Sequence, residues 1–347
     1  MPLAFTSLER ALILDGASPE AIARAADALA AGELVGLPTE TVYGLATDAG
    51  NDAAVRGIFA AKGRPADHPL IVHVANQAGV ARFAAEVPAF AGRLIDAFWP
   101  GPLTLILPRR PGMAEAAAGG HPTVGLRCPA HPVAHALLAA CAARGVHGLA
   151  APSANRFGRV SPTTAAHVAA EFGDALLVLD GGACDVGIES TIVDCSRGAP
   201  VLLRPGQLGQ ADIERVAGTR LLSKEELAAP DPQAPGTLLA HYAPNAKLRL
   251  MEAAQLRTAL DILGPDAAHI AVYARTPLRS ASARLIVRRM PDDAAATAQQ
   301  LFAVLREFDA AGARLIWVET PPADAAWDGV RDRLTRAAAS AWPLPRA

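Results

Sequence analysis

The sequence has no apolar run that approaches the roughly 20 residues needed to cross a bilayer. Near its start, the apolar stretch 8–13 is interrupted by Glu9 and Arg10, so the uninterrupted core of a secretory signal is absent. The apolar fraction of 51% and the charged fraction of 19% are typical of an ordinary globular protein. We therefore expect a soluble, cytoplasmic protein without a membrane partner.

Cysteine is also scarce, and no two cysteines form a C-x-x-C pair. Neither a disulfide framework nor a zinc site is indicated, and we expect buried thiols. His131 and His135 have helical i, i+4 spacing, but the glutamate of an H-E-x-x-H motif and a third ligand are missing. No protein metal site is therefore expected. The four cysteines are Cys128, Cys141, Cys184 and Cys195.

Lysine is rare among the 32 basic residues, and Lys62 is the only lysine in the first 223 residues. Arginine is a planar fork, whereas lysine is a compact charge on a flexible stem. The pattern favours a site that needs one mobile ammonium, although chance is the alternative explanation. The net charge of -2 argues against coating of nucleic acid by bulk electrostatics, while a local basic groove stays open.

The standard phosphate-binding motifs are missing, since there is no P-loop and no glycine fingerprint after a strand. Ser153 is not in a G-x-S-x-G elbow, so a serine hydrolase has little support. Lys62-Gly63-Arg64-Pro65 follows a helix expected over 53–61, which would free two cations to point at a phosphate. A routine C-terminal helix cap is the alternative.

Short apolar runs alternate with helical patterns from Ala21 to Pro205, which indicates an α/β fold. Ser161 followed by Pro162 predicts an N-cap for a helix that runs toward Glu171. Proline and glycine bound the strands, so functional residues are expected in the loops. The expected strands include 34–37, 70–74, 103–107, 176–179 and 201–203.

A chain of 347 residues predicts two domains, and the periodicity fails between Ser223 and Lys247. This proline-rich connector contains His241 and Tyr242, which are unusual in a spacer and indicate a segment that folds back onto a site. A small α/β domain follows, without a nucleotide motif, and we assign it no catalytic role. Its expected strands are 248–251, 270–273, 285–287 and 315–318, and its expected helices are 253–263, 294–310 and 329–339.

Polar side chains gather where several expected strands end. Loop 38–45 packs two hydroxyls, a carboxylate and a phenol into five positions, which suits a small polar ligand. Thr123 and Arg127 are four residues apart, so both face the same side of an extended strand, and Arg127 is suited to clamp a carboxylate. Segments 151–155 and 187–191 place small polar groups at further strand ends. Together these loops predict one composite site.

Seven motifs, taken in order, resemble the YrdC/Sua5 family, the threonylcarbamoyl-AMP synthases. They are PTETVYGL (38–45), KGRPADHPLIVH (62–73), WPGPLTLIL (99–107), TVGLRCPAHP (123–132), APSAN (151–155), GIESTIVD (187–194) and LLRPG (202–206). The connector motif APGTLLAHYAP (234–244) and the tail resemble the linker and C-terminal domain of two-domain members.

The resemblance implies three parts. Residues 15–220 would form a YrdC-like twisted mixed sheet with helices around a concave cationic cavity. Residues 221–247 would form an extended linker over the active site. Residues 248–347 would form a smaller, Rossmann-like α/β Sua5 domain.

The resemblance also implies synthesis of L-threonylcarbamoyladenylate from L-threonine, bicarbonate or CO2, and ATP, with release of pyrophosphate and water, for the t6A modification of tRNA. Lys62 and Arg64 form the cationic K-x-R signature, to which we assign catalysis. The positions that match threonine-binding residues are Thr39, His73, Arg127, Ala151 and Ser190. Those that match ATP-binding residues are Arg64, His68, Thr123, Ser153, Ser161, Arg204 and Tyr242.

One departure from the family pattern is His68, which stands where other members carry asparagine, so its contact with the nucleotide stays open. Mg²⁺ is expected to arrive on the ATP phosphates, because it often uses substrate oxygens and few protein ligands. No general base is evident. The implied macromolecular partners are tRNA or the proteins of a t6A transferase complex.

Two other classes of function compete with this interpretation. A YrdC-like domain could bind double-stranded RNA on a concave basic face without catalysis, but the near-neutral charge weakens this. A carbamoyltransferase step, as in hydrogenase maturation proteins, would require acylphosphatase-like and zinc-finger segments that the chain lacks. Bicarbonate-dependent release of pyrophosphate separates the three.

Overall fold

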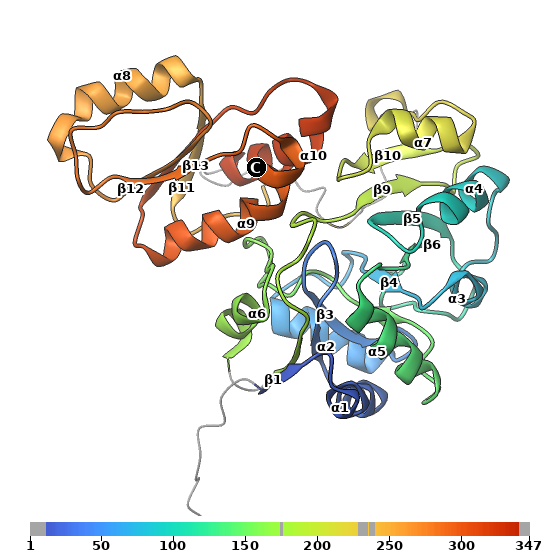
Figure 1. The fold of residues 1–347 in the computed structure, drawn as a ribbon. Coiled ribbons are helices and arrows are strands. Elements are labelled where there is room, and N and C mark those ends of the chain that lie inside the picture. The colour runs from blue at the N-terminus through green and yellow to red at the C-terminus, as the bar shows by residue number, and fades with distance from the viewer. Residues whose placement is uncertain (1–11, 174–175, 228–234, 236–239, 340–347) are drawn as a thin grey trace, which may run out of the picture.

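The computed structural model describes residues 12–173, 176–227, 235 and 240–339. They form two α/β units, a large one up to Leu227 and a smaller one from Lys247 onward (Figure 1). The sequence-based prediction of an α/β fold with a second, smaller α/β domain is confirmed. The boundaries proposed at 220 and 248 stay a prediction.

The large unit is built on a ten-stranded mixed sheet whose middle strands end at the loops of interest. Parallel pairing of β4 with β6 aligns His73 with Arg127, so two predicted site residues are neighbours across the sheet. In spatial order the strands are β1 (Leu12–Asp15), β8 (Leu177–Asp180), β2 (Val35–Leu37), β3 (Gly44–Asp48), β7 (Leu149–Ala150), β4 (Ile71–His73), β6 (Thr123–Arg127), β5 (Leu103–Pro108), β9 (Thr191–Asp194) and β10 (Val201–Arg204). All five expected strands are present.

Helices cover this sheet and bury two apolar clusters against it. One cluster holds residues of α1 and α5, and the other holds residues of α2, α3, α4, α6 and α7. All four cysteines are buried and free, as expected. The helices are α1 (Pro19–Ala30), α2 (Asp52–Lys62), α3 (Gln77–Phe83), α4 (Ala89–Phe98), α5 (Pro132–Ala142), α6 (Ala165–Phe172) and α7 (Gln210–Ala217).

The helix expected to start at Ser161 begins later. Thr164 is the N-cap of α6, and its hydroxyl accepts a hydrogen bond from the backbone N–H of His167. The Ser161 hydroxyl instead donates to Glu189, so this side chain is not available as a cap. The cap prediction was therefore wrong by three residues, because a long-range partner outcompeted the local one.

The small unit is a four-stranded parallel sheet in the order β11 (Lys247–Met251), β14 (Leu315–Glu319), β12 (Ile270–Ala274) and β13 (Ile286–Arg289). Helix α8 (Ala253–Leu263) covers its outer face, and α9 (Ala294–Ala310) and α10 (Asp328–Ala339) lie on the face toward the large unit (Figure 1). Every strand and helix expected here is present. None of the helices in the described ranges is long and apolar enough to cross a membrane.

One apolar cluster spans both units. Val42, Ile188 and Tyr242 pack with residues of α9 and α10, among them Phe302. At Gly187, with φ +76°, a Cβ atom would lie 2.3 Å from the carbonyl oxygen of Gln299, so only glycine admits this approach of α9. The two units therefore share a core and do not merely touch.

Candidate active site

The loops at the strand ends converge on one cavity of about 40 Å³ beneath the connector. Nine predicted site residues line it, namely Thr39, Arg64, His73, Arg127, Ala151, Ser153, Ser190, Arg204 and Tyr242. Eight further residues line the cavity and lie within the same motifs, although the sequence assigns them no individual role, namely Thr41, Val42, Gly44, Ile71, Pro152, Glu189, Pro235 and His241. The motifs that the sequence analysis brought together thus supply the residues of the cavity wall.

A buried ion pair lies at one end of the cavity. Arg127 Nη2 is 2.7 Å from Glu40 Oε1, a close charge contact without the angle of a hydrogen bond. Arg127 also donates to the hydroxyl of Thr41 at 2.8 Å and to the carbonyl of Gly101 at 3.2 Å. Although burial opposes ionisation of Glu40, Arg127 holds its pKa below the usual value. This end thus presents a fixed guanidinium whose charge is largely compensated.

His73 lies beside this pair on β4. Burial, reinforced by Arg127, lowers its pKa to about 3, so the imidazole is neutral near pH 7. Its Nδ1 atom is buried and has no hydrogen-bond partner among the described residues. Thr39, in the adjacent loop, donates its hydroxyl to the carbonyl of Val42 at 2.6 Å. A small polar ligand would find here a neutral imidazole and a rigid hydroxyl.

Lys62 ends α2 directly before Gly63, which takes the left-handed conformation at φ +63° and stops the helix. The ammonium does not extend toward solvent. It donates to the backbone carbonyls of Ser153, at 2.5 Å, and of Asn155, and the side chain is buried. Burial and the neighbouring Arg64 hold the pKa of Lys62 well below its ordinary value. Lys62 thus lies behind the cavity wall and is absent from its lining.

Arg64 follows on the same turn and does line the cavity. It donates to the carbonyl of Pro69 at 3.0 Å, and its guanidinium lies 5.6 Å from the ring centroid of Phe157. Burial lowers its pKa to about 10, which leaves it charged at neutral pH. The sequence expectation of two cations freed by a helix stop is therefore met at Arg64, whereas Lys62 turns inward.

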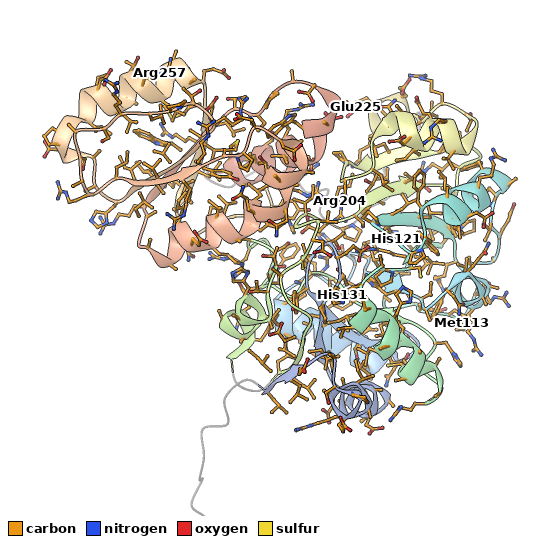
Figure 2. The ribbon with its side chains drawn as sticks, in the orientation of Figure 1. Met113, His121, His131, Arg204, Glu225 and Arg257 are labelled. Carbon is orange, nitrogen blue, oxygen red and sulfur yellow. The ribbon has the colours of Figure 1, made fainter. Side chains whose placement is uncertain are left out.

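Arg204, at the end of β10, is the third cation and lies where the two units meet (Figure 2). Its Nε donates to the carbonyl of Ser190 at 3.1 Å and its Nη2 to the Ser190 hydroxyl at 3.2 Å. Its Nη1 donates to the carbonyl of Pro235 in the connector at 2.9 Å. The guanidinium is buried and fixed on two sides, with the connector held against it.

The connector residues His241 and Tyr242 close the cavity. The two rings meet edge to face at 4.2 Å, and Tyr242 stacks on Phe302 of α9 at 5.5 Å. Burial lowers the pKa of His241 to about 3 and raises that of Tyr242 to about 12. His241 Nδ1 and the Tyr242 hydroxyl have no hydrogen-bond partner within the described residues. Both residues line the cavity, while 228–234 and 236–239 lie outside the described residues, so an extended linker over the active site stays a prediction.

Three predicted ATP-binding residues do not line this cavity. Thr123 lines a smaller neighbouring cavity of about 10 Å³, together with Ile106, Ile192 and other largely apolar residues. His68 lies partly exposed, 5.5 Å edge to face from Phe157. Ser161 is fully buried behind Glu189. They surround the cavity without forming its wall.

The comparisons with known proteins cover both units. The family model Sua5_yciO_yrdC, described as telomere recombination, matches residues 27–206, which is more than half of the chain. The chain belongs to the Sua5/YciO/YrdC family. A second model, the threonylcarbamoyl-AMP synthase C-terminal domain, matches residues 208–339. This arrangement is that of a two-domain, Sua5-type member.

Among its relatives in this family, the threonylcarbamoyl-AMP synthase of Pyrococcus abyssi is 44% identical over 224 residues, 64% of this chain and 65% of that protein. The Bacillus subtilis threonylcarbamoyl-AMP synthase is 43% identical over 234 residues, 67% of this chain and 66% of that protein. Both sequence alignments thus span just under two thirds of the relatives' own length. The crystal structure of P. abyssi Sua5 complexed with L-threonine superposes with a TM-score of 0.83 at 35% identity, covering 92% of this chain and 94% of that one.

Proposed function

We propose that this protein is an L-threonylcarbamoyladenylate synthase, a nucleotidyltransferase that uses L-threonine, bicarbonate or CO2, and ATP. The observation that carries the proposal is the convergence of Arg64, Arg204 and Arg127 on one cavity. The family relatives named threonylcarbamoyl-AMP synthase support it. Its product would serve the t6A modification of tRNA in the cytoplasm, with tRNA or the proteins of a t6A transferase complex as partners.

The threonine end would be the wall around Arg127. A threonine carboxylate would contact the guanidinium and the Thr41 hydroxyl that Arg127 already holds, while the neutral His73 would accept a hydrogen bond from the ligand. Thr39, Ala151 and Ser190 would complete this subsite. The structure of a relative complexed with L-threonine supports the assignment.

The nucleotide end would be the wall around Arg64 and Arg204. Both pKa values are lowered chiefly by burial, so a triphosphate would gain from meeting two desolvated cations. Arg204 would exchange its bond to the Pro235 carbonyl for a phosphate oxygen. Ser153 and Tyr242 line the same wall, and His68, Thr123, Ser161 and Lys62 surround it.

Among the described residues, the two glutamates at the cavity wall already have partners within the protein. Glu189 binds Ser161 with one carboxylate oxygen and Arg333 with the other, and Glu40 is paired with Arg127. No cluster of three metal-binding side chains occurs in the described part of the chain. We infer that Mg²⁺ enters bound to the phosphates of ATP, as part of the substrate.

In the proposed reaction the threonine amine adds to CO2 and loses a proton, which gives a carbamate. A carbamate oxygen then bonds to the α-phosphorus of ATP while the bond to pyrophosphate breaks. Two anions must be brought together, so catalysis would come from positioning and from the charges of Lys62, Arg64 and Arg204. No covalent intermediate with the protein is needed.

The test is release of pyrophosphate by the full chain with ATP, threonine and bicarbonate, compared with reactions that omit one substrate. Release should need all three. Lys62→Met should lower the rate about tenfold, because the buried carbonyls of Ser153 and Asn155 behind the cavity wall would lose their donor. Lys247→Met is the matched control, because Lys247 lies exposed on β11, away from the cavity, and should keep the wild-type rate. A folded wild-type protein that releases no pyrophosphate would overturn the proposal.

A further inference from the structure

Arg333 on α10 is a charged residue of the small unit that is buried against the large one. Its side chain has 0% exposure and contacts the 187–191 loop in two places. Nε donates to Glu189 Oε2 at 2.9 Å and Nη2 to the Glu189 carbonyl at 2.9 Å. Nη1 donates to the carbonyl of Pro205, next to Arg204, at 2.6 Å. The buried guanidinium of Arg333 thus holds both Glu189, just before β9, and Pro205, just after β10.

Glu189 links Arg333 to the predicted ATP-binding residues. It lines the cavity, and its second oxygen accepts the hydroxyl of Ser161. Although burial opposes ionisation, Arg333 and then Arg204 hold the pKa of Glu189 below its usual value. An ionised glutamate in this wall would repel a triphosphate unless its charge were compensated. Arg333 provides that compensation and leaves Arg204 to its own contacts with Ser190.

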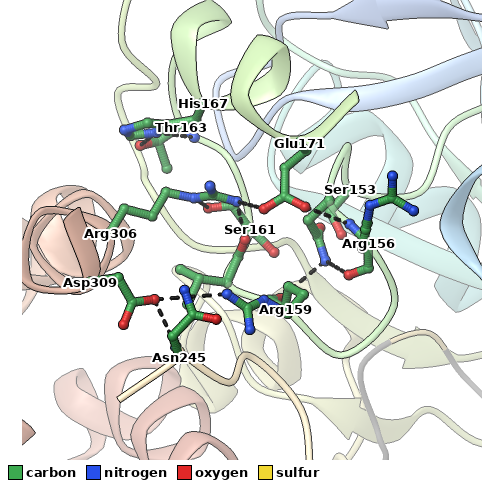
Figure 3. A network of polar contacts seen from close by, with 12 residues as sticks. Ser153, Arg156, Arg159, Ser161, Thr163, His167, Glu171, Asn245, Arg306 and Asp309 are labelled. Atoms are coloured by element: carbon green, nitrogen blue, oxygen red, sulfur yellow. Dashed lines mark hydrogen bonds and ion pairs between the residues drawn. The ribbon is translucent and has the colours of Figure 1, made fainter. Parts of the chain in front are cut away.

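A second arginine of the small unit fixes the backbone of the same site. Arg306 on α9 donates to the carbonyls of Val160 and Ser161, and it forms an ion pair with Glu171 at 2.8 Å. Figure 3 shows its guanidinium between Ser161 and Glu171. Ser161 is therefore held by its backbone through Arg306 and by its hydroxyl through Glu189.

Glycine at two contact points allows this close docking. Gly187 admits the backbone of α9, as described above. At Gly329, in the first turn of α10, a Cβ atom would lie 2.8 Å from Ile188 and 3.0 Å from the Gly206 carbonyl. The helix that carries Arg333 thus contacts both loops that Arg333 binds.

We propose that Arg333 is a positioning residue of the active site, which fixes and neutralises Glu189 and thereby completes the ATP-binding wall from the C-terminal domain. From sequence motifs alone, we assign this domain no catalytic role. The inference rests on the proposed function for the identity of the ligand, but its test uses binding of ATP and does not require turnover.

The experiment measures the Kd of ATP·Mg²⁺ and, separately, of L-threonine by calorimetry on full-length variants. Arg333→Met should weaken ATP binding about tenfold, because the uncompensated charge of Glu189 would then face the triphosphate, and should leave threonine binding unchanged. Arg331→Met is the matched control, because the contacts of Arg331 with Pro322, Asp324 and Asp328 lie within the small unit. It should bind both ligands as the wild type does. Wild-type ATP affinity in a folded Arg333→Met protein would overturn the inference.

The double variant Glu189→Gln, Arg333→Met separates positioning from packing. It removes both buried charges, and the glutamine can still accept the Ser161 hydroxyl, so ATP binding should return to near the wild-type level. If the double variant still binds ATP about tenfold more weakly than the wild type does, Arg333 acts only by packing and the inference fails. The same comparison with the wild type decides the question if Arg333→Met alone does not fold. A wild-type protein that binds ATP but makes no product would overturn the proposed function and leave this inference to the binding data.

Discussion

Two buried arginine–glutamate pairs each contribute one residue to the wall of the same cavity, and they differ in how they are assembled. Arg127 and Glu40 both belong to the large unit and meet at 2.7 Å. Arg333 and Glu189 meet at 2.9 Å only because α10 of the small unit docks on the 187–191 loop. The first pair is formed within the large unit alone, by a strand and a loop, whereas the second requires both units.

The arginines of the two pairs would therefore have different roles. At the threonine end, the arginine lines the cavity and the glutamate lies behind it, so the cation would meet the ligand. At the nucleotide end, the glutamate lines the cavity and Arg333 lies behind it, so Arg64 and Arg204 are the cations that face the cavity. Arg127 would thus bind threonine directly, whereas Arg333 would neutralise Glu189 so that ATP can bind beside it.

Breaking the threonine-end pair should have the largest effect. Arg127→Met leaves Glu40 as an uncompensated buried carboxylate, which should lower the free energy of unfolding by about 3–5 kcal/mol. The double variant Glu40→Gln, Arg127→Met should regain most of this stability, because both charges are removed. Urea denaturation measures these values, and calorimetry measures threonine binding.

The two doubly substituted pairs should then behave differently. The Glu40→Gln, Arg127→Met protein should be stable and should not bind threonine, since the cation itself would contact the ligand. The nucleotide-end double variant should be stable and should bind ATP. Retained threonine binding without Arg127 would show that the two ends are not organised in the way proposed here.

Acid should destabilise both ends through their histidines. His73 and His241 each have a folded-state pKa of about 3, mainly because of burial, against about 6.5 when unfolded. Below pH 6.5 the unfolded chain gains protons that the folded chain takes up only near pH 3, so stability falls as the pH falls through this window. At pH 5 the loss should be about 2 kcal/mol for each histidine.

Thermal unfolding of the wild type, His73→Gln and His241→Gln at pH 7 and pH 5 measures this. Each substitution should reduce the pH dependence by a similar amount. Some should remain in both variants, because burial also lowers the pKa of His167, to about 4. A variant with the full wild-type pH dependence would show that its histidine is accessible to protons in the folded protein.

The sequence predicted the elements and most of the cavity wall, because strand ends with proline, glycine and small polar groups are local signals. Lys62 attracted attention as an isolated lysine, but its inward bond to the Ser153 carbonyl depends on a loop 91 residues away. Glu189 was quoted within a motif without a role, since its partner Arg333 lies 144 residues further along the chain. Arg333 itself is one of several arginines on α10, and helical periodicity does not distinguish it from Arg331. Only docking of the two units does so.

The smallest effect is expected at Tyr242, which belongs to the connector and closes the nucleotide end. Its hydroxyl has no hydrogen-bond partner in the described ranges, so Tyr242→Phe should keep the ring contacts with Phe302 and His241 and change the free energy of unfolding by less than about 1 kcal/mol. If the hydroxyl binds ATP, the same change should weaken ATP binding by about three- to tenfold and leave threonine binding unaltered. Unchanged ATP affinity would instead limit Tyr242 to an aromatic packing role between the domains.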